Sequence, residues 1–452
     1  MEICKNCAIM NPTSKNQVQL LDYCRTVCGK VAVDTLRIGG KRMKRIVALV
    51  LSLTLLLSLA ACGGSKTETP ETTVEKIKTD VAESLSWDRI NAIPIANDTM
   101  SEEELRQICL DFMRLQLTFG WTPSQQVTYK GSANSEKTFY PGKVYGGIPY
   151  MSVHFGNIYT AADYCDPDNG VMDLSGGAET IDLFANQCSS SMFWAYARVC
   201  NSVTYRFTWG VLEKNGCLRV GDYTYPETLE SYSKNKTMDI CASNGMSVMF
   251  EAYAQLEPAD GIVNYSSAGH MRMIAEKPNV VRGADGTIDP AKSTITYLDQ
   301  IANWSKSTQS NGIEYEVEGG VDVTVNFLDL YNDGYLPFTV AELNKEKPVD
   351  KAETTIDCKD TSVSAAALGQ YTVTSNYAIS DITVSVKDAD GKEVYSKTEV
   401  AYLENLVNFS VKLELLDAEG LKPYADGKHT VEISARIGTG EKPVVYVGTL
   451  IA

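Results

Sequence analysis

The chain of 452 residues is poor in positive charge and in histidine. It carries 41 Lys and Arg against 57 Asp and Glu, a formal net charge of −16, and only three histidines. Because proteins that bind nucleic acid need clustered positive charge to contact phosphates, the composition argues against that class. No glycine-rich loop follows a strand pattern, which argues against a nucleotide-dependent enzyme. No tandem repeat, cofactor or metal site is predicted.

One long apolar run is present, over residues 43 to 62. Two basic residues, Lys44 and Arg45, precede an apolar stretch that ends in Leu-Ala-Ala-Cys at Cys62. The run is too short, and too abruptly followed by polar residues, for a helix that stays in the bilayer. It is typical of a signal peptide over residues 43–61. It resembles a bacterial lipoprotein signal, which implies cleavage before Cys62, diacylation of Cys62 and attachment to the extracytoplasmic face of the cell membrane. An ordinary signal peptide with an incidental cysteine is the alternative.

The 42 residues before Met43 do not fit a secretory signal, which belongs at the N-terminus. We interpret residues 1–42 as the product of a misplaced start codon, because Gly39-Gly40-Lys41-Arg42 is what an in-frame ribosome-binding sequence would encode. The segment also holds two cysteine pairs whose spacing superficially suits zinc: Cys4 and Cys7, and Cys24 and Cys28. We favour accidental translation, and the nucleotide sequence tests it.

Residues 62 to 452, 391 in all, suffice for two or three domains. They hold 32 basic and 54 acidic residues, a net charge of −22 that suits an extracytoplasmic surface. Residues 62–90 begin with a polar, Thr- and Glu-rich stretch that predicts a flexible tether. A helix is predicted from about residue 101 to 117, with Ser101 and Glu104 as its capping box.

Seven cysteines follow Cys62, an odd number, so at least one is expected to be unpaired within the chain. They are Cys109, Cys165, Cys188, Cys200, Cys217, Cys241 and Cys358. An amphipathic pattern from Ser189 places Cys188 at a helix N-terminus. There the helix dipole and unpaired NH groups are expected to lower the thiol pKa from its usual value of about 8.5. The alternative is a buried or disulfide-bonded Cys188.

A reactive thiol needs a base, and histidine titrates in the right range. His270 is predicted to begin a strand with alternating faces, shortly after a turn at Pro258-Ala259-Asp260. His154 lacks that context, and His429 lies in what looks like a separate domain. We therefore predict His270 as the partner of Cys188, with a purely structural histidine as the alternative.

These motifs occur in the order found in the NlpC-type and CHAP-type cell-wall cysteine hydrolases, which the chain resembles over residues 143 to 304. The matching motifs are Gly147-Ile148-Pro149-Tyr150, Cys188, Pro258-Ala259-Asp260 and Gly269-His270-Met271. Gln187 is more similar to the CHAP branch. Three serines after Cys188, and Ala259 in place of glycine, depart from the family pattern. The resemblance implies an α+β papain-like domain over residues 91–345 that cleaves an amide bond in peptidoglycan peptides, as an endopeptidase or an amidase.

The resemblance also implies roles for individual residues. Cys188 would be the nucleophile and His270 the acid and base, with a polar group holding the imidazole by its second nitrogen. For that third residue we favour Asp299, then Gln300, then Asp289. The Cys188 backbone NH and the Gln187 side chain would stabilise the oxyanion. Tyr150 is predicted to contact substrate, with core packing as the alternative.

From about residue 358 the pattern changes to short alternating segments separated by turns. Strands are predicted over 370–374, 381–387, 394–398, 407–415, 430–437 and 444–450, with turns at Asp390-Gly391 and Asp426-Gly427. This predicts an all-β immunoglobulin-like sandwich over residues 355–452, after a boundary near 342–353. Such a module more often spaces or binds than catalyses.

The sequence thus predicts a lipid-anchored cysteine hydrolase whose partners are cell-wall peptide and the membrane. The alternative is a catalytically inactive surface lipoprotein that uses the papain-like scaffold and the sandwich to recognise glycan or protein. A solute-binding lipoprotein would need two lobes of alternating strands and helices, and the chain lacks that alternation.

Overall fold

A computed structural model of the chain describes most of its residues from 83 onward. The described ranges are 83–132, 135–152, 154–203, 216–224, 236–265, 269–308, 314–402, 408–413 and 418–452. The segment 1–42, the predicted signal peptide over 43–61 and Cys62 lie outside them. Within the described ranges, no helix has both the length and the apolar character needed to cross a membrane.

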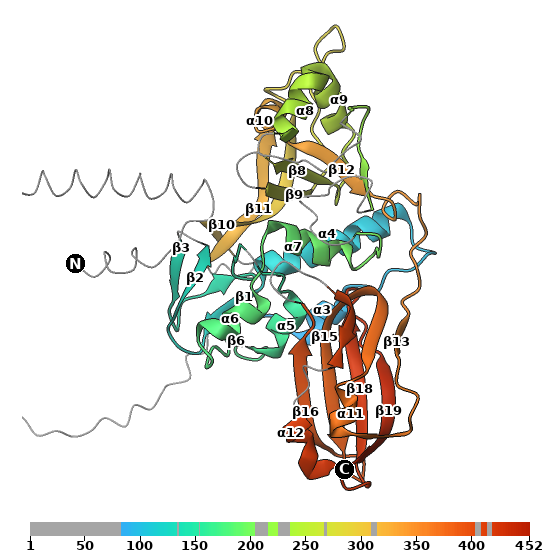
Figure 1. Ribbon diagram of the computed structural model, residues 1–452. Helices are drawn as coiled ribbons and strands as arrows, with labels where there is room; N and C mark the ends of the chain where they lie inside the picture. Colours follow the sequence, from blue (N-terminus) through green and yellow to red (C-terminus); the bar gives the residue numbers. More distant parts are fainter. Residues whose placement is uncertain are drawn as a thin grey trace, which may run out of the picture. The chain divides into compact units, whose positions relative to one another are not determined.

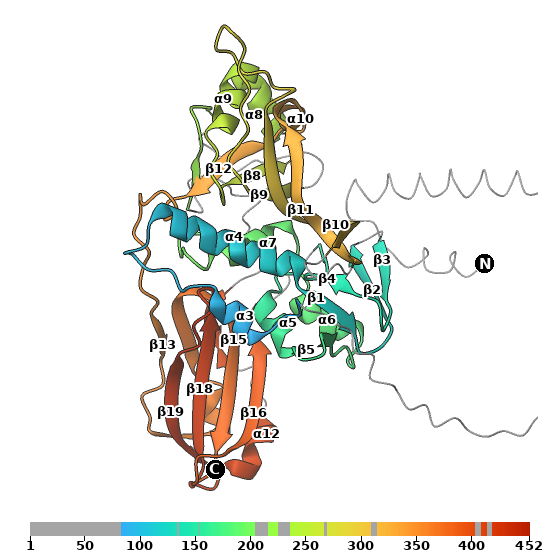
Figure 2. The same ribbon diagram turned by 180° about the vertical axis from the view of Figure 1, so that it is seen from behind.

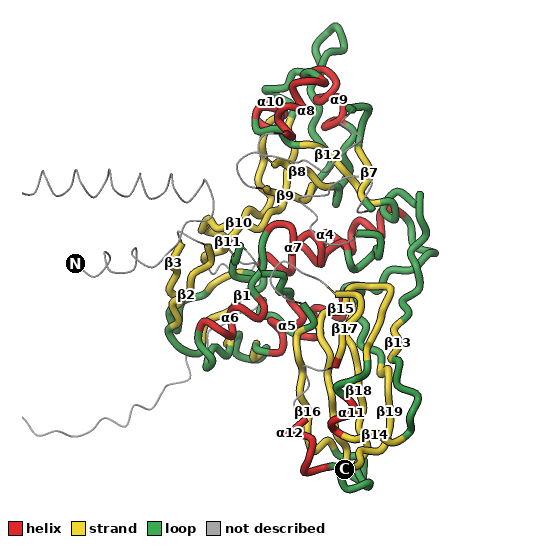
Figure 3. Tube along the Cα trace, viewed as in Figure 1, coloured by secondary structure: helices red, strands yellow, loops and turns green. Residues whose placement is uncertain are grey.

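The described chain is a mixed α/β protein that contains two large sheets and a short hairpin (Figure 1; Figure 3, strands in yellow). The first sheet has the order β5 (Cys165–Asp166), β6 (Val171–Met172), β1 (Gly120–Pro123), β4 (Tyr145–Gly146), β11 (Glu314–Asn326), β10 (Thr294–Thr308), β9 (Gly269–Ile274), β8 (Gly261–Tyr265), β12 (Leu336–Val340) and β7 (Cys217–Arg219). The hairpin joins β2 (Val127–Ser132) to β3 (Ser135–Phe139).

Short helices accompany the first sheet. They are α3 (Trp87–Ala92), α4 (Glu102–Thr118), α5 (Ile158–Asp163), α6 (Ala178–Phe184), α7 (Cys188–Tyr196), α8 (Lys236–Asn244), α9 (Met246–Ala254) and α10 (Phe327–Asn332). The capping box predicted for α4 is confirmed, because the Ser101 NH donates to Glu104 Oε2 at 2.8 Å and the Glu104 NH donates to Ser101 Oγ at 3.2 Å. Helix α4 lies beside α7 (Figure 2), and Gln116 Nε2 donates to the Ser191 carbonyl at 2.9 Å.

The predicted tether does not extend as far as residue 90. Leu85 and Ile90 are buried, and Ser84 bridges to Gly120 of β1. Helix α3 begins at Trp87, with Ser86 as its N-cap. The polar composition that predicted a tether ends before these residues, and the two apolar side chains join the core of the first sheet.

The second sheet lies in the C-terminal part of the chain. Its order is β13 (Thr354–Ile356), β15 (Thr372–Lys387), β18 (Thr430–Ile437), β19 (Val444–Ile451) and β14 (Ser362–Ser364), and β16 (Glu393–Val400) and β17 (Asn408–Lys412) also pair with β15. Short helical segments lie at α11 (Ala365–Leu368), α12 (Ala418–Leu421) and Lys422–Tyr424. The glycine of the predicted Asp390-Gly391 turn has a φ of 78°, the conformation that favours glycine there.

The two strands predicted over 370–374 and 381–387 are one continuous strand, β15. Its first half pairs with β13 and β17, and its second half pairs with β16 and β18. Tyr377 and Ile379, in the stretch predicted to separate the strands, are buried. These buried side chains hold the backbone in the sheet through the predicted gap.

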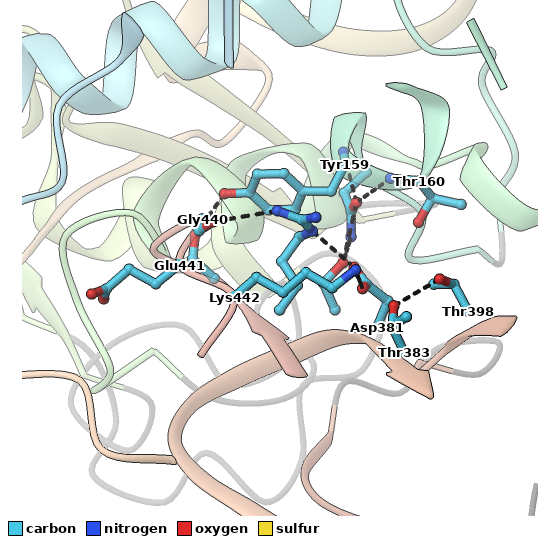
Figure 4. Close-up of polar contacts among 12 residues, drawn as sticks. Tyr159, Thr160, Asp381, Thr383, Thr398, Gly440, Glu441 and Lys442 are labelled. Carbon is cyan, nitrogen blue, oxygen red and sulfur yellow. Dashed lines mark hydrogen bonds and ion pairs between the residues drawn. The ribbon is translucent and has the colours of Figure 1, made fainter. Parts of the chain in front are cut away.

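Polar contacts connect this second sheet to helices of the first part (Figure 4). The Tyr159 hydroxyl donates to the Gly438 carbonyl at 2.9 Å, and the hydroxyls of Thr160 and Tyr402 lie 2.9 Å apart. Beside them the buried Asp381 is paired with Arg436, at 3.2 Å, and with Lys442, at 3.5 Å. Tyr402 also packs edge-on against Trp194 of α7, with ring centroids 5.9 Å apart. The segment that follows β16 therefore contacts the helix that begins with Cys188.

Candidate active site

Cys188 is the first residue of α7, as predicted. The Gln187 NH donates to Ser190 Oγ at 2.8 Å, and Ser191 Oγ donates to Asn186 Oδ1 at 2.9 Å. Ser190 and Ser191 therefore hold the start of the helix. The Cys188 side chain is buried, with its sulfur 4.0 Å from the Gly269 carbonyl. All seven cysteines in the described part of the chain are free, so the disulfide alternative for Cys188 is wrong in this structure.

His270 and Asp299 lie on adjacent antiparallel strands, β9 and β10. His270 Nε2 is 2.9 Å from Asp299 Oδ2, and the Gly320 NH donates to Asp299 Oδ1 at 2.7 Å. Cys188 is the other group close to the His270 ring, and its interaction with the imidazole helps to raise the His270 pKa. Because Asp299 occupies Nε2, Nδ1 is the ring nitrogen left for the sulfur. The structure thus brings together Cys188, His270 and Asp299 from three separate segments.

The surroundings of His270 favour its protonated form. Burial alone would lower its pKa, but the hydrogen bonds to Asp299 and Cys188, together with their charges, outweigh burial and raise the pKa to about 9. His270 is therefore an imidazolium at neutral pH, the state that pairs with a thiolate and can protonate a leaving amine.

This raised pKa predicts a pH dependence of stability. A group whose pKa is higher in the folded than in the unfolded state stabilises the fold fully below its unfolded pKa, here about 6.5. That contribution is lost as the pH rises through about 9. We expect the melting temperature of the wild type to exceed that of His270→Gln at pH 6, and the difference to shrink between pH 7 and 10. A difference that stays constant over this range would contradict the assigned pKa.

The other two candidates for the third residue have different partners. Gln300 is fully buried, and its Nε2 donates to the Ile148 carbonyl at 2.7 Å, so it holds the loop before Tyr150. Asp289 pairs with Lys292 at 2.6 Å, which lowers the Asp289 pKa. Of the three candidates, Asp299 contacts His270, whereas Gln300 and Asp289 have other partners in the described part of the chain.

The Gly147-Ile148-Pro149-Tyr150 segment lies beside the start of α7. The Asn186 NH donates to the Pro149 carbonyl at 3.1 Å, and the Met151 NH donates to the Asn186 carbonyl at 2.7 Å. Gly147 has a φ of +68°, and a Cβ there would lie 2.5 Å from the Leu117 carbonyl oxygen, so only glycine fits. Tyr150 is half-buried, and burial together with the nearby Cys188 raises its pKa. The phenol therefore stays neutral close to the thiol.

The Pro258-Ala259-Asp260 turn lies away from the thiol. It lies at the end of the β8–β9 hairpin where Gly261 pairs with Met273. His270 lies toward the other end, where it pairs with Asn264. The buried Asp260 accepts a hydrogen bond from Arg106 at 2.7 Å. The turn therefore supports the hairpin and supplies no group to Cys188.

Ala259 lies in this turn, and its φ is 68°. An L-residue in this left-handed conformation costs about 1–2 kcal/mol. We expect Ala259→Gly to raise the free energy of unfolding by up to about 1 kcal/mol, since part of the relief is offset by the freedom of glycine in the unfolded chain. Ala252→Gly, within α9, is the control and should lower the free energy of unfolding by about 1 kcal/mol. Denaturant unfolding measures both, and equal losses would show that Ala259 is unstrained.

Sequence reasoning missed two charged features near these residues. Arg272 Nε lies 3.3 Å from Asp299 Oδ2, and Lys137 forms a buried ion pair with Glu318, whose Oε2 accepts from the Tyr150 NH at 2.9 Å. Arg272 follows His270 by two residues and so shares its face of the strand, a signal available from the sequence. The pairing of Lys137 with Glu318 joins distant segments and left no such signal.

A separate cleft of about 700 Å³ lies beside the first turns of α4. Arg106, Arg219 and Lys277 line it together with Glu102 and Glu257. Cys188, His270 and Asp299 are not part of this lining, so cleft and triad are distinct features of the fold.

The described fold and site define a mixed α/β protein with a buried Cys-His-Asp cluster. Comparisons with protein families, with curated proteins and with solved structures found no match for this chain.

Proposed function

We propose that the protein is a cysteine hydrolase of papain-like type. The observation that carries the proposal is the cluster in which Cys188 begins α7 and meets His270, whose other ring nitrogen lies 2.9 Å from Asp299. A thiol at a helix N-terminus, a histidine on a neighbouring strand and a carboxylate that orients it are the parts that amide hydrolysis requires. The papain-like domain would span residues 83–345, since Leu85 and Ile90 join its core, and an immunoglobulin-like sandwich would follow over 355–452.

The mechanism follows from these positions. The Cys188 thiolate attacks the amide carbonyl carbon and forms a C–S bond. The His270 imidazolium gives its proton to the leaving amine as the C–N bond breaks. Water then transfers a proton to His270 while its oxygen attacks the thioester, and the thiolate leaves. The Cys188 backbone NH has no acceptor within the first turn of its helix, so it can donate to the oxyanion, with the half-buried Gln187 beside it.

The proposed substrate is the peptide of peptidoglycan, as the resemblance to NlpC-type and CHAP-type hydrolases implies. A lipid on Cys62 would hold the domain at the extracytoplasmic face of the cell membrane, near that substrate. Endopeptidase and amidase cleavage both agree with the mechanism, because each breaks a C–N bond next to a carbonyl.

The test is incubation of the purified protein with peptidoglycan, with the released fragments identified by mass. Wild type should release fragments and Cys188→Ala should release none, and the fragment masses would name the bond. Cys358→Ala is the matched control, because Cys358 packs against the core of the C-terminal sheet and should not affect release. Equal release by wild type and Cys188→Ala would refute the proposal.

One observation favours the second candidate, an inactive binding protein that recognises glycan or protein. Cys188 is only 4% exposed, less than expected of a nucleophile that must meet a polymer. Thiol-probe kinetics separate the two candidates, because a binding protein has no need of a reactive thiol. Faster labelling of Cys188 than of the more exposed Cys358 at pH 7 would favour the hydrolase. Slower labelling of Cys188 than of Cys358 would favour the binding protein.

A further inference from the structure

Asp299 has a second cationic partner besides His270. Arg272 lies two residues after His270 on β9, and both side chains reach the same oxygen, Asp299 Oδ2, at 3.3 Å and 2.9 Å. The other oxygen accepts from the Gly320 NH at 2.7 Å. Three donors therefore fix a buried carboxylate, and only one of them is the histidine.

Two aromatic rings hold the Arg272 guanidinium in place. Its central carbon lies 4.2 Å from the ring centroid of Tyr297 and 4.7 Å from that of Tyr335. Tyr335 is itself fixed, because its carbonyl accepts from the Tyr253 hydroxyl at 2.7 Å. A planar guanidinium stacks on such faces while it donates at its edge, which an ammonium does not do as well.

The charges around the thiol balance only when Arg272 is included. Cys188 from α7 and Asp299 from β10 contribute two negative charges in the ion-paired state, and His270 and Arg272 from β9 contribute two positive ones. All four groups lie in a site largely excluded from water, with the Arg272 side chain 16% exposed. Without Arg272, the imidazolium alone would face two anions, and Asp299 would lose a donor that directs Oδ2 toward His270.

We propose that Arg272 is a positioning residue of the Cys188 site, which holds Asp299 Oδ2 against His270 from a clamp formed by Tyr297 and Tyr335. The proposal rests on the proposed hydrolase function. It requires that Arg272 act through Asp299 rather than through the stability of the strand.

The experiment measures alkylation of Cys188 by iodoacetamide at pH 7 in the purified full-length protein, with the labelled peptide quantified by mass. We expect Arg272→Met to slow alkylation about ten-fold, the size expected for loss of one hydrogen bond to a charged group. Arg272→Lys should recover part of the rate. In an Asp299→Asn background, Arg272→Met should cause no further loss, because the two residues act as a unit. Arg282→Met, which breaks an exposed ion pair with Glu251, is the control and should leave the rate unchanged.

Two results would overturn the proposal. Arg272→Met with a wild-type rate and a wild-type melting temperature would show that Asp299 needs no second cation. The same loss in both backgrounds would show that Arg272 acts elsewhere. The proposed function fails separately: a protein that leaves peptidoglycan intact but shows the non-additive loss would refute the substrate and retain the role of Arg272.

Discussion

Replacement of His270 with glutamine is expected to lower the rate of peptidoglycan cleavage by about 10²- to 10⁴-fold, the range that general acid–base catalysis contributes. Glutamine keeps much of the shape and can still hydrogen-bond to Asp299, but it cannot carry a proton to the leaving amine. The rate of fragment release, measured where it is proportional to the protein concentration, gives the effect. The melting temperature reports whether the fold is retained.

The chain offers two matched controls for this variant. His429 Nδ1 lies 2.8 Å from Asp426 Oδ1, and His154 Nε2 lies 3.8 Å from Asp182 Oδ1. Each of these histidines therefore also pairs with a carboxylate. Neither pair includes a thiol, and His429→Gln and His154→Gln should cleave at the wild-type rate. Retention of activity in His270→Gln, or an equal loss in all three variants, would exclude His270 as the acid and base.

The parts of the site that the sequence predicted are those with local signals. The α4 capping box follows from two residues three apart. The start of α7 at Cys188 is confirmed, but the amphipathic pattern predicted for that helix is wrong, because all nine of its residues are buried. The strand that begins near His270 follows from alternation. Each of these signals lies within about ten residues of chain, so no tertiary information was needed.

The choice between Asp299 and Gln300 had no local signal. Neighbouring strand residues face opposite sides, so one reaches the histidine and the other does not, and only the register of β10 against β9 decides which. The register pairs Tyr297 with Ile274 and Leu298 with Met273. The Arg272 contact depends on the same register, because the Asp299 side chain must reach both cationic residues of β9.

Two segments that were predicted to be irregular, residues 83–90 and the middle of β15, are ordered by buried apolar side chains. Residues 83–90 and the middle of β15 were predicted as tether and turn from their polar residues. In both, a few apolar side chains, among them Leu85 and Ile379, are fully buried. Burial of one such side chain is worth about 1.5–3 kcal/mol, which outweighs the weak local preference of the polar neighbours.

Replacement of Lys137 with methionine is expected to lower the free energy of unfolding by about 3–5 kcal/mol, the cost of leaving a buried charge without its ionic partner. Both side chains of the Lys137–Glu318 pair are almost fully buried, at 4% and 1% exposure. Methionine has a similar shape, so the loss would reflect the charge of Glu318 and not a cavity. Lys277→Met is the control: its pair with Glu257 is exposed and should contribute no more than about 1 kcal/mol.

The double variant Lys137→Met with Glu318→Gln separates charge from packing. A neutral amide can still accept from the Tyr150 NH and the Tyr129 hydroxyl, as Glu318 Oε2 does at 2.9 Å and 3.3 Å. We therefore expect the double variant to recover much of the stability lost in Lys137→Met, as measured by denaturant unfolding. If the free energy of unfolding does not recover, the loss comes from the packing of the Lys137 side chain and not from the unpaired Glu318 carboxylate. Since Glu318 supports the backbone of Tyr150, and Tyr150 lies close to Cys188, recovery of stability should be accompanied by recovery of the Cys188 alkylation rate.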